Sequence, residues 1–76
     1  MARDRHYYEQ EQYLTSIVWC VYYGGVRVKD AIIKVTKIKR SLEFDLSSLP
    51  ISKAKSNLKL SNDCLKYLRD LQRRGY

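Results

Sequence analysis

The first pattern along the chain is an apolar stripe at helical spacing within residues 5–23. Its members follow one another at i, i+3, i+4, i+7 and i+8: Leu14, Ile17, Val18, Val21 and Tyr22. Residues 15–28 also fit a β-hairpin, because β-branched and aromatic residues precede Gly24-Gly25 and a second apolar run follows it. The spacing favours a helix that ends just before Gly24, and the hairpin is the alternative.

The same helical spacing returns in residues 28–39, with lysines on the opposite side. The apolar positions are Val28, Ala31, Ile32, Val35 and Ile38. Residues 42–46 then alternate apolar and acidic side chains, which predicts a short half-buried strand or an extended connection. Ser47-Ser48 and Pro50 interrupt the chain next.

The C-terminal third predicts two helices separated by a break. A short helix is expected over residues 51–58, and Lys59-Leu60 ends it. Ser61 is a favourable N-cap for a final helix over 62–74, whose buried stripe is Cys64, Leu65, Leu68 and Leu71. The chain is therefore expected to be one mainly α domain over residues 1–76, or α+β if residues 15–28 form the hairpin.

Charge divides this domain into two regions. The 76 residues carry 15 basic and 8 acidic side chains, a net charge of +7. Residues 1–23 have a net charge of −1 and hold six of the nine aromatic residues, whereas residues 24–76 have a net charge of +8. The chain thus has an aromatic N-terminal element and a basic region, and the basic region predicts an acidic partner such as nucleic acid.

Several functional classes find no support in the sequence. The longest apolar run covers residues 17–23, which is too short to span a membrane, and no secretory signal is expected. Two cysteines and one histidine offer neither a metal site nor a catalytic set, so we expect a non-enzymatic cytoplasmic protein without metal or cofactor. Cys20 and Cys64 are expected to be reduced core thiols, with a single disulfide as the alternative.

The candidate chemistry lies on the final predicted helix. One face of it, opposite the buried leucines, holds four polar residues at i, i+4, i+7 and i+11: Asn62, Lys66, Arg69 and Arg73. Lysine and arginine neutralise phosphates, arginine also pairs with guanine, and asparagine pairs with adenine. A solvated charged face would show the same pattern, so this stripe alone does not establish nucleic-acid binding.

The residues around the stripe resemble a known family. Leu58-Lys59-Leu60-Ser61 followed by NDCLKYLRDL resembles the turn and second helix of helix-turn-helix proteins. LKYLRDLQRRGY is similar to the end of that helix in small winged-helix regulators of microbes and their viruses, although Lys59 stands where glycine is usual. The resemblance covers about residues 28–76. It implies that Asn62, Lys66, Arg69 and Arg73 face the DNA groove and that five lysines grip phosphates: Lys53, Lys55, Lys59, Lys34 and Lys37.

The sequence therefore predicts a small DNA-binding protein, a transcriptional regulator that docks its C-terminal helix on duplex DNA. The N-terminal aromatic residues complete the core, form a homodimer interface or stack on nucleic-acid bases, and the candidate interface residues are Tyr13, Trp19, Tyr22 and Tyr23. One alternative is a phage or mobile-element protein that inhibits a host protein or nucleoprotein by binding an acidic surface. Another alternative is an RNA-binding protein.

Overall fold

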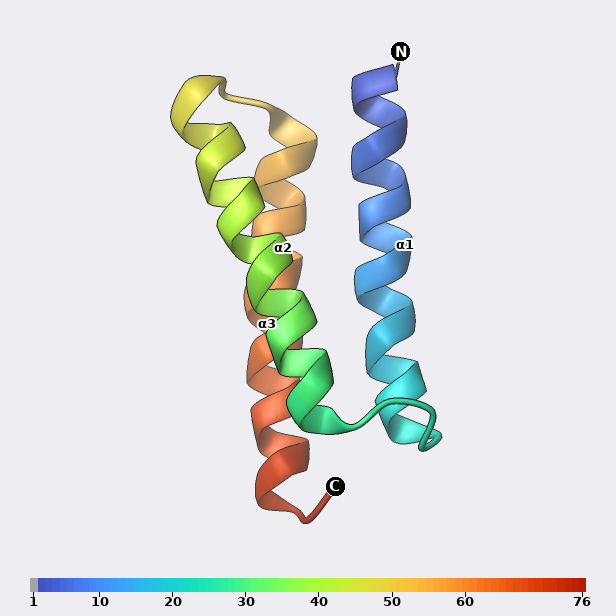
Figure 1. Cartoon of the computed structure of the whole chain (residues 1–76). Helices are drawn as coiled ribbons and strands as arrows, with labels where there is room; N and C mark the ends of the chain where they lie inside the picture. Colours follow the sequence, from blue (N-terminus) through green and yellow to red (C-terminus); the bar gives the residue numbers. More distant parts are fainter. Residues whose placement is uncertain (1) are drawn as a thin grey trace.

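The computed structural model of the chain describes the backbone of residues 2–76 and the side chains of residues 5–76. It consists of three helices: α1 (Ala2–Tyr22), α2 (Val28–Ser48) and α3 (Ser52–Arg73). The helices run alternately up and down, and α2 and α3 form the closest pair, with α1 packed along them (Figure 1). Residues 2–76 contain no strand, so the prediction of a mainly α single-domain bundle is confirmed.

The N-terminal element is a helix, and the hairpin alternative is wrong. Gly24 has a φ of 83°, in the left-handed region that glycine adopts most easily. The backbone N–H groups of Gly25 and Val26 donate to the carbonyl oxygen of Cys20 at 2.7 and 3.3 Å. These hydrogen bonds close the end of α1 and turn the chain towards α2.

The strand or extended connection predicted for residues 42–46 is also wrong, because α2 continues to Ser48. Leu42 is buried and Leu46, one helical turn later, is half-buried, while Phe44 between them is 74% exposed. Leu42 and Leu46 are thus on the same face of a helix, four residues apart, and Phe44 is on another face, so the apolar–acidic alternation of residues 42–46 does not indicate a strand here. Leu49 has φ and ψ of −141° and 138°, the extended conformation favoured before a proline, and this conformation ends α2.

The break predicted at residues 59–61 does not exist, because α3 is one uninterrupted helix from Ser52 to Arg73. Ser61 is not an N-cap. It is fully buried, and its hydroxyl donates to the carbonyl oxygen of Asn57 at 2.9 Å, one turn earlier. Neither glycine nor proline lies between residues 52 and 73 to stop the helix. The local turn that carried the helix-turn-helix resemblance is therefore absent.

The core lies along the centre of the bundle and draws on all three helices. Its main cluster is Leu14, Ile17, Val21, Val28, Ala31, Val35, Cys64, Leu65, Leu68 and Leu71. A smaller cluster of Tyr7, Leu42 and Ala54 fills the end near the α2–α3 connection. The predicted apolar stripes are thus largely buried, except that Tyr22 is 50% exposed.

Buried polar contacts fix α1 against its neighbours. The side-chain amide of Asn57, which is fully buried, donates to the carbonyl oxygen of Tyr7 at 2.8 Å and to Oε1 of Gln10 at 3.0 Å. The Tyr7 hydroxyl donates to Oδ2 of Asp45 on α2 at 2.8 Å. Because a buried polar group is costly to leave unpaired, these bonds favour one register of α1 along the other two helices.

The two cysteines are both free, so the disulfide alternative is wrong. Cys64 is buried as predicted, but Cys20 is exposed, and its predicted place in the core is wrong. The reason is helical rotation: Cys20 is one residue before the buried Val21, and the 100° step of the helix turns its side chain to another face of α1.

Candidate functional site

One flank of α3 carries a stripe of exposed polar and basic side chains, which we call the basic flank. Because α3 is unbroken, alternating steps of four and three residues place six side chains on one face: Lys55, Lys59, Asn62, Lys66, Arg69 and Arg73. All six are exposed, and none is acidic. The stripe extends over about 27 Å, at a rise of 1.5 Å per residue.

A shallow groove of about 410 Å³ between α2 and α3 holds the C-terminal half of this flank. It is lined by Lys39, Asn62, Leu65, Lys66, Arg69 and Arg73. The structure thus brings together the four residues predicted to face DNA and adds Lys39, which the sequence analysis missed. A signal for Lys39 existed, since it lies four residues after the buried Val35, but recognising it requires knowing that α2 and α3 pack side by side.

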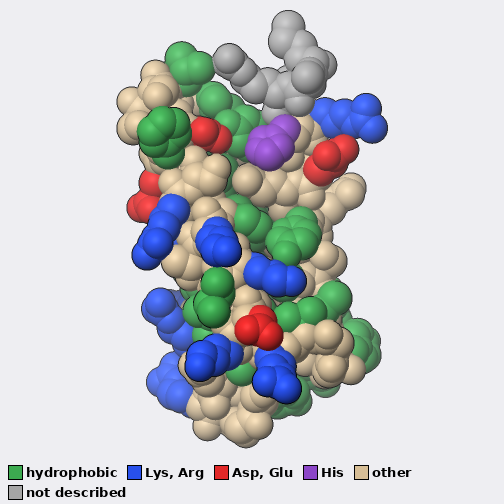
Figure 2. All heavy atoms as spheres, viewed as in Figure 1, with side chains coloured by type: hydrophobic (Ala, Val, Ile, Leu, Met, Phe, Trp, Pro, Cys, Tyr) green, Lys and Arg blue, Asp and Glu red, His purple; other side chains and the backbone are tan. Residues whose placement is uncertain are grey.

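The five predicted phosphate-binding lysines fall in three places. Lys55 and Lys59 belong to the basic flank. Lys34 and Lys37 line a separate hollow of about 480 Å³, together with Arg27 and Asp30. Figure 2 shows lysine and arginine side chains gathered over the middle and lower part of the viewed face. The structure therefore does not bring the nine predicted residues together on one surface.

Lys53, the fifth predicted phosphate-binding lysine, lies between α3 and α1. Its ammonium group is 2.7 Å from Oε2 of Glu11 and 4.7 Å from the centre of the Tyr8 ring. In both contacts the positive charge of Lys53 interacts with a side chain of the same chain, the carboxylate of Glu11 or the ring of Tyr8. Lys53 therefore ties the start of α3 to α1 and lies apart from the basic flank.

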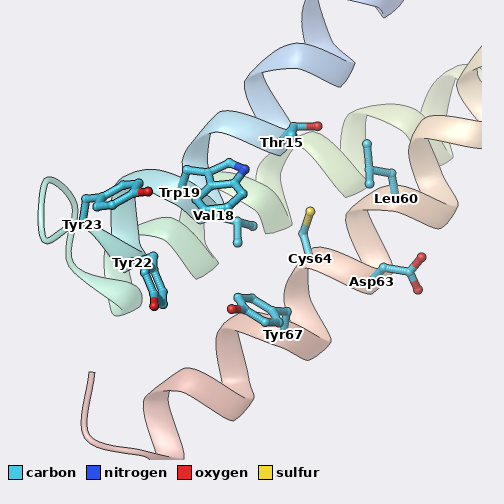
Figure 3. Close-up of a pocket in the computed structure, with 9 residues that line it drawn as sticks. All are labelled: Thr15, Val18, Trp19, Tyr22, Tyr23, Leu60, Asp63, Cys64 and Tyr67. Atoms are coloured by element: carbon cyan, nitrogen blue, oxygen red, sulfur yellow. The ribbon is translucent and has the colours of Figure 1, made fainter.

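The opposite flank of α3 and the adjoining face of α1 enclose a groove of about 760 Å³, which we call the aromatic groove (Figure 3). Its lining residues are Thr15, Val18, Trp19, Tyr22, Tyr23, Leu60, Asp63, Cys64 and Tyr67. Among these residues Asp63 alone is charged, and its carboxylate points away from the rings in Figure 3. The groove is therefore apolar and has no lysine or arginine in its lining.

The rings around the groove contact one another. Trp19 stacks on Tyr23 with 5.9 Å between ring centres, and Tyr22 meets the edge of Trp19 at 6.3 Å. Tyr22 also stacks on Tyr76 at 6.2 Å. These four rings are each exposed over half or more of their surface, and Tyr67 on the other wall is 45% exposed. The result is a large exposed aromatic surface, a feature typical of interaction sites.

Three of the four predicted interface residues belong to this surface: Trp19, Tyr22 and Tyr23. Tyr13 does not line the groove, because helical rotation turns it to the other side of α1. Tyr67 and Tyr76 were missed. The spacing of Leu60, Asp63, Cys64 and Tyr67 would have indicated Tyr67 if one continuous helix had been expected. No sequence signal indicated Tyr76, which follows the end of α3 and stacks on Tyr22 without lining the groove itself.

Cys64 lies on the floor of the aromatic groove. Its thiol points away from Tyr67, into the space between Val18 and Leu60 in Figure 3, and donates to the carbonyl oxygen of Leu14 at 3.7 Å. Burial raises the pKa of this thiol above its ordinary value, and the negative charge of Asp63 raises it further. Cys64 is therefore protonated near neutral pH, and as a thiol it is a weak nucleophile.

Among residues 5–76, no group of histidine, cysteine, aspartate or glutamate side chains is placed to hold a metal ion. No helix within residues 2–76 has the length and apolar character needed to cross a membrane.

No family model matches this sequence, and no curated protein or solved structure matches it significantly. The basic flank and the aromatic groove are therefore the two features of the molecule on which a functional inference rests.

Proposed function

We propose that this chain is a small DNA-binding protein that docks the basic flank of α3 on duplex DNA and regulates transcription from that position. The observation that carries the proposal is the stripe of six exposed residues, five of them cationic, along about 27 Å of unbroken helix. Duplex DNA presents one negative charge per roughly 1.7 Å of its axis, so this length matches about eight base pairs of phosphates. Lys39 of α2, which lines the same groove as Arg69, adds a sixth cation.

The order of side chains along the stripe supports a division of roles. Lys55 and Arg73 lie at its two ends, where cations neutralise phosphates and set the position of the protein. Asn62, Lys66 and Arg69 lie between them, and in the major groove asparagine pairs with adenine while lysine and arginine pair with guanine. The basic flank would thus be held by its ends and read bases through its middle.

Duplex DNA fits the basic flank better than the alternatives do. The major groove of B-form DNA admits an α-helix, whereas that of double-stranded RNA is too deep and narrow for side chains to read. The even spacing of charge over five helical turns suits a polyanion with a regular repeat, and duplex DNA is such a polyanion. The free thiols of Cys20 and Cys64 agree with work in the reducing cytoplasm.

The test is a titration of a fluorescent 20-base-pair duplex at several salt concentrations. Five to six phosphate contacts would make log K fall with log salt at a slope of roughly −4.5 to −5.4. Lys66→Glu with Arg69→Glu should weaken binding at least about 100-fold and make the slope shallower by roughly 2. Lys34→Glu with Lys37→Glu is the matched control, because it makes the same change in net charge on another face and should cost less than about tenfold.

Two results would overturn the proposal. Equal loss of affinity in both pairs of variants would mean that DNA responds to net charge and not to the basic flank. Absence of duplex binding tighter than ~10 μM at 100 mM salt, with binding of RNA or of an acidic protein instead, would favour one of the alternative functions. Circular dichroism of each variant verifies that the bundle is intact.

A further inference from the structure

The aromatic groove takes no part in the proposed contact with DNA, and we propose that it is the interface of a homodimer, in which each copy of the chain covers the aromatic groove of the other. This inference does not depend on the proposed function. It rests on the polarity of the groove, its shape and its exposed area.

Polarity selects a protein surface as the occupant. No lysine or arginine lines the groove, and the charged residue in its lining, Asp63, is acidic. A nucleic-acid strand stacked on the rings would place its phosphates where no cation of the lining meets them. Tryptophan and tyrosine on an uncharged surface are instead the residues that contribute most energy to protein interfaces.

Charge favours this face for contact between two copies of the chain. Each copy has a net charge of +7, so two copies repel each other when their basic surfaces meet. The basic excess lies in residues 24–76, while residues 1–23, which supply the α1 wall of the aromatic groove, have a net charge of −1. Contact through the aromatic groove therefore brings two like-charged copies together without placing cations of the lining against each other.

The shape of the surface is self-complementary. A two-fold interface needs one patch that provides both the projecting groups and the space that receives them. Here Trp19 and Tyr23, which are 55% and 76% exposed, project beside a hollow of about 760 Å³. A ring from each copy can enter the hollow of the other, which satisfies the two-fold requirement.

The exposed aromatic area supplies more than half of what a standard interface buries. Five aromatic side chains of 150–250 Å² each, exposed over about half of their surface, present on the order of 500 Å² per copy: Trp19, Tyr22, Tyr23, Tyr67 and Tyr76. The apolar remainder of the groove adds to this, and a standard interface buries about 800 Å² per partner. Because the basic flank lies on the opposite side of α3, such a dimer leaves both basic flanks uncovered.

The experiment is sedimentation equilibrium of the full chain, without nucleic acid, from about 1 to 300 μM. We expect the mass to rise with concentration from 9.0 kDa towards twice that value. Trp19 is the one tryptophan of the chain, so its emission should shift to shorter wavelength over the same range as the second copy covers it.

Variants locate the interface. Trp19→Ala with Tyr23→Ala should weaken the dimer about 30-fold or more, the effect of losing one hot spot of roughly 2 kcal/mol. Both side chains are largely exposed, so the core remains complete. Tyr67→Glu, on the α3 wall, should have the same effect by placing a charge in the interface. Phe44→Ala is the control, because Phe44 is 74% exposed on α2 outside the groove.

Two results would overturn the proposal. A mass of 9.0 kDa at 300 μM would show that the groove does not receive a second copy. A dimer that persists in both Trp19→Ala/Tyr23→Ala and Tyr67→Glu would place the interface elsewhere. Because the protein is studied alone, neither result depends on whether the basic flank binds DNA.

Discussion

The two flanks of α3 belong to the same helix but have opposite chemistry. The basic flank packs beside α2, is exposed along its whole length and carries five cations. The aromatic groove lies beside α1, has a buried floor at Cys64 and contains no cation in its lining. The neighbouring helix determines the chemistry of each flank: α2 adds Lys39 to the basic side, and α1 adds Trp19, Tyr22 and Tyr23 to the aromatic side.

The unbroken course of α3 makes this separation rigid. Between the two flanks runs the buried stripe of the helix, with Asn57, Ser61 and Leu68 fully buried. A turn at residues 59–61 would have divided the basic flank into two parts with independent directions. As one helix, α3 fixes the angle between the two surfaces, so the proposed second copy at the aromatic groove would leave the basic flank open to the proposed DNA contact.

The largest expected effect is a break in the contact between α1 and α3. Asn57→Ala removes the two hydrogen bonds from its side-chain amide to Tyr7 and Gln10 and leaves a small void in the core. We expect the free energy of unfolding to fall by about 1–3 kcal/mol, because the Tyr7 carbonyl and the Gln10 amide oxygen lose a donor and a void opens, a cost that exceeds the gain from removing the buried Asn57 Oδ1, which has no partner. Urea unfolding followed by circular dichroism measures the change.

Ser56→Ala is the matched control for Asn57→Ala. Ser56 is the preceding residue of α3, is exposed, and donates only to the carbonyl oxygen of Ser52 within the same helix. Its replacement should change stability by less than ~0.5 kcal/mol. Equal stability of the two variants would mean that the Asn57 amide does not hold α1 in place.

The next effect tests whether the basic flank lies on one continuous helix. Lys59→Ala and Lys59→Gly remove the same charge, so they should weaken DNA binding equally. In the middle of an exposed helical segment, glycine is about 1 kcal/mol less favourable than alanine, so Lys59→Gly should be the less stable variant by that amount. Thermal unfolding of the two variants in parallel gives the difference. Equal stability, or a more stable glycine variant, would indicate a turn at this position.

The sequence contained enough information to place most of the core. The spacing of Val28, Ala31 and Val35 and of Cys64, Leu65 and Leu68 predicted residues that are buried in the structure. One local signal did indicate the continuity of α3, the absence of glycine and proline between residues 52 and 73, but serine is also a favoured N-cap residue, and position 61 was therefore interpreted as a helix start. In this chain the burial of Ser61 and its bond to the Asn57 carbonyl oxygen override that local preference.

The candidate site shows the same division between local and tertiary information. Asn62, Lys66, Arg69 and Arg73 were placed on one face correctly, because helical rotation is a local property. The addition of Lys39, the separation of Lys34 and Lys37, and the pairing of Lys53 with Glu11 depend on how the helices pack. The periodicity of the sequence predicts the buried face of each helix, but it does not predict which helices pack side by side.

The smallest expected effect concerns the floor of the aromatic groove and appears only at alkaline pH. Burial, with a contribution from Asp63, raises the pKa of Cys64 in the folded chain above its ordinary value of 9.0. As the pH rises from about 8, the unfolded chain loses this proton first, so the unfolded state binds fewer protons and the free energy of unfolding falls.

Cys64→Ala should remove the part of this alkaline fall in the free energy of unfolding that the Cys64 thiol causes. Cys20→Ala, at an exposed thiol, should keep it. Urea unfolding at pH 7, 8.5 and 9.5 gives the comparison. An identical decline in the wild type and Cys64→Ala would show that the thiol of Cys64 ionises as easily in the folded chain as in the unfolded one.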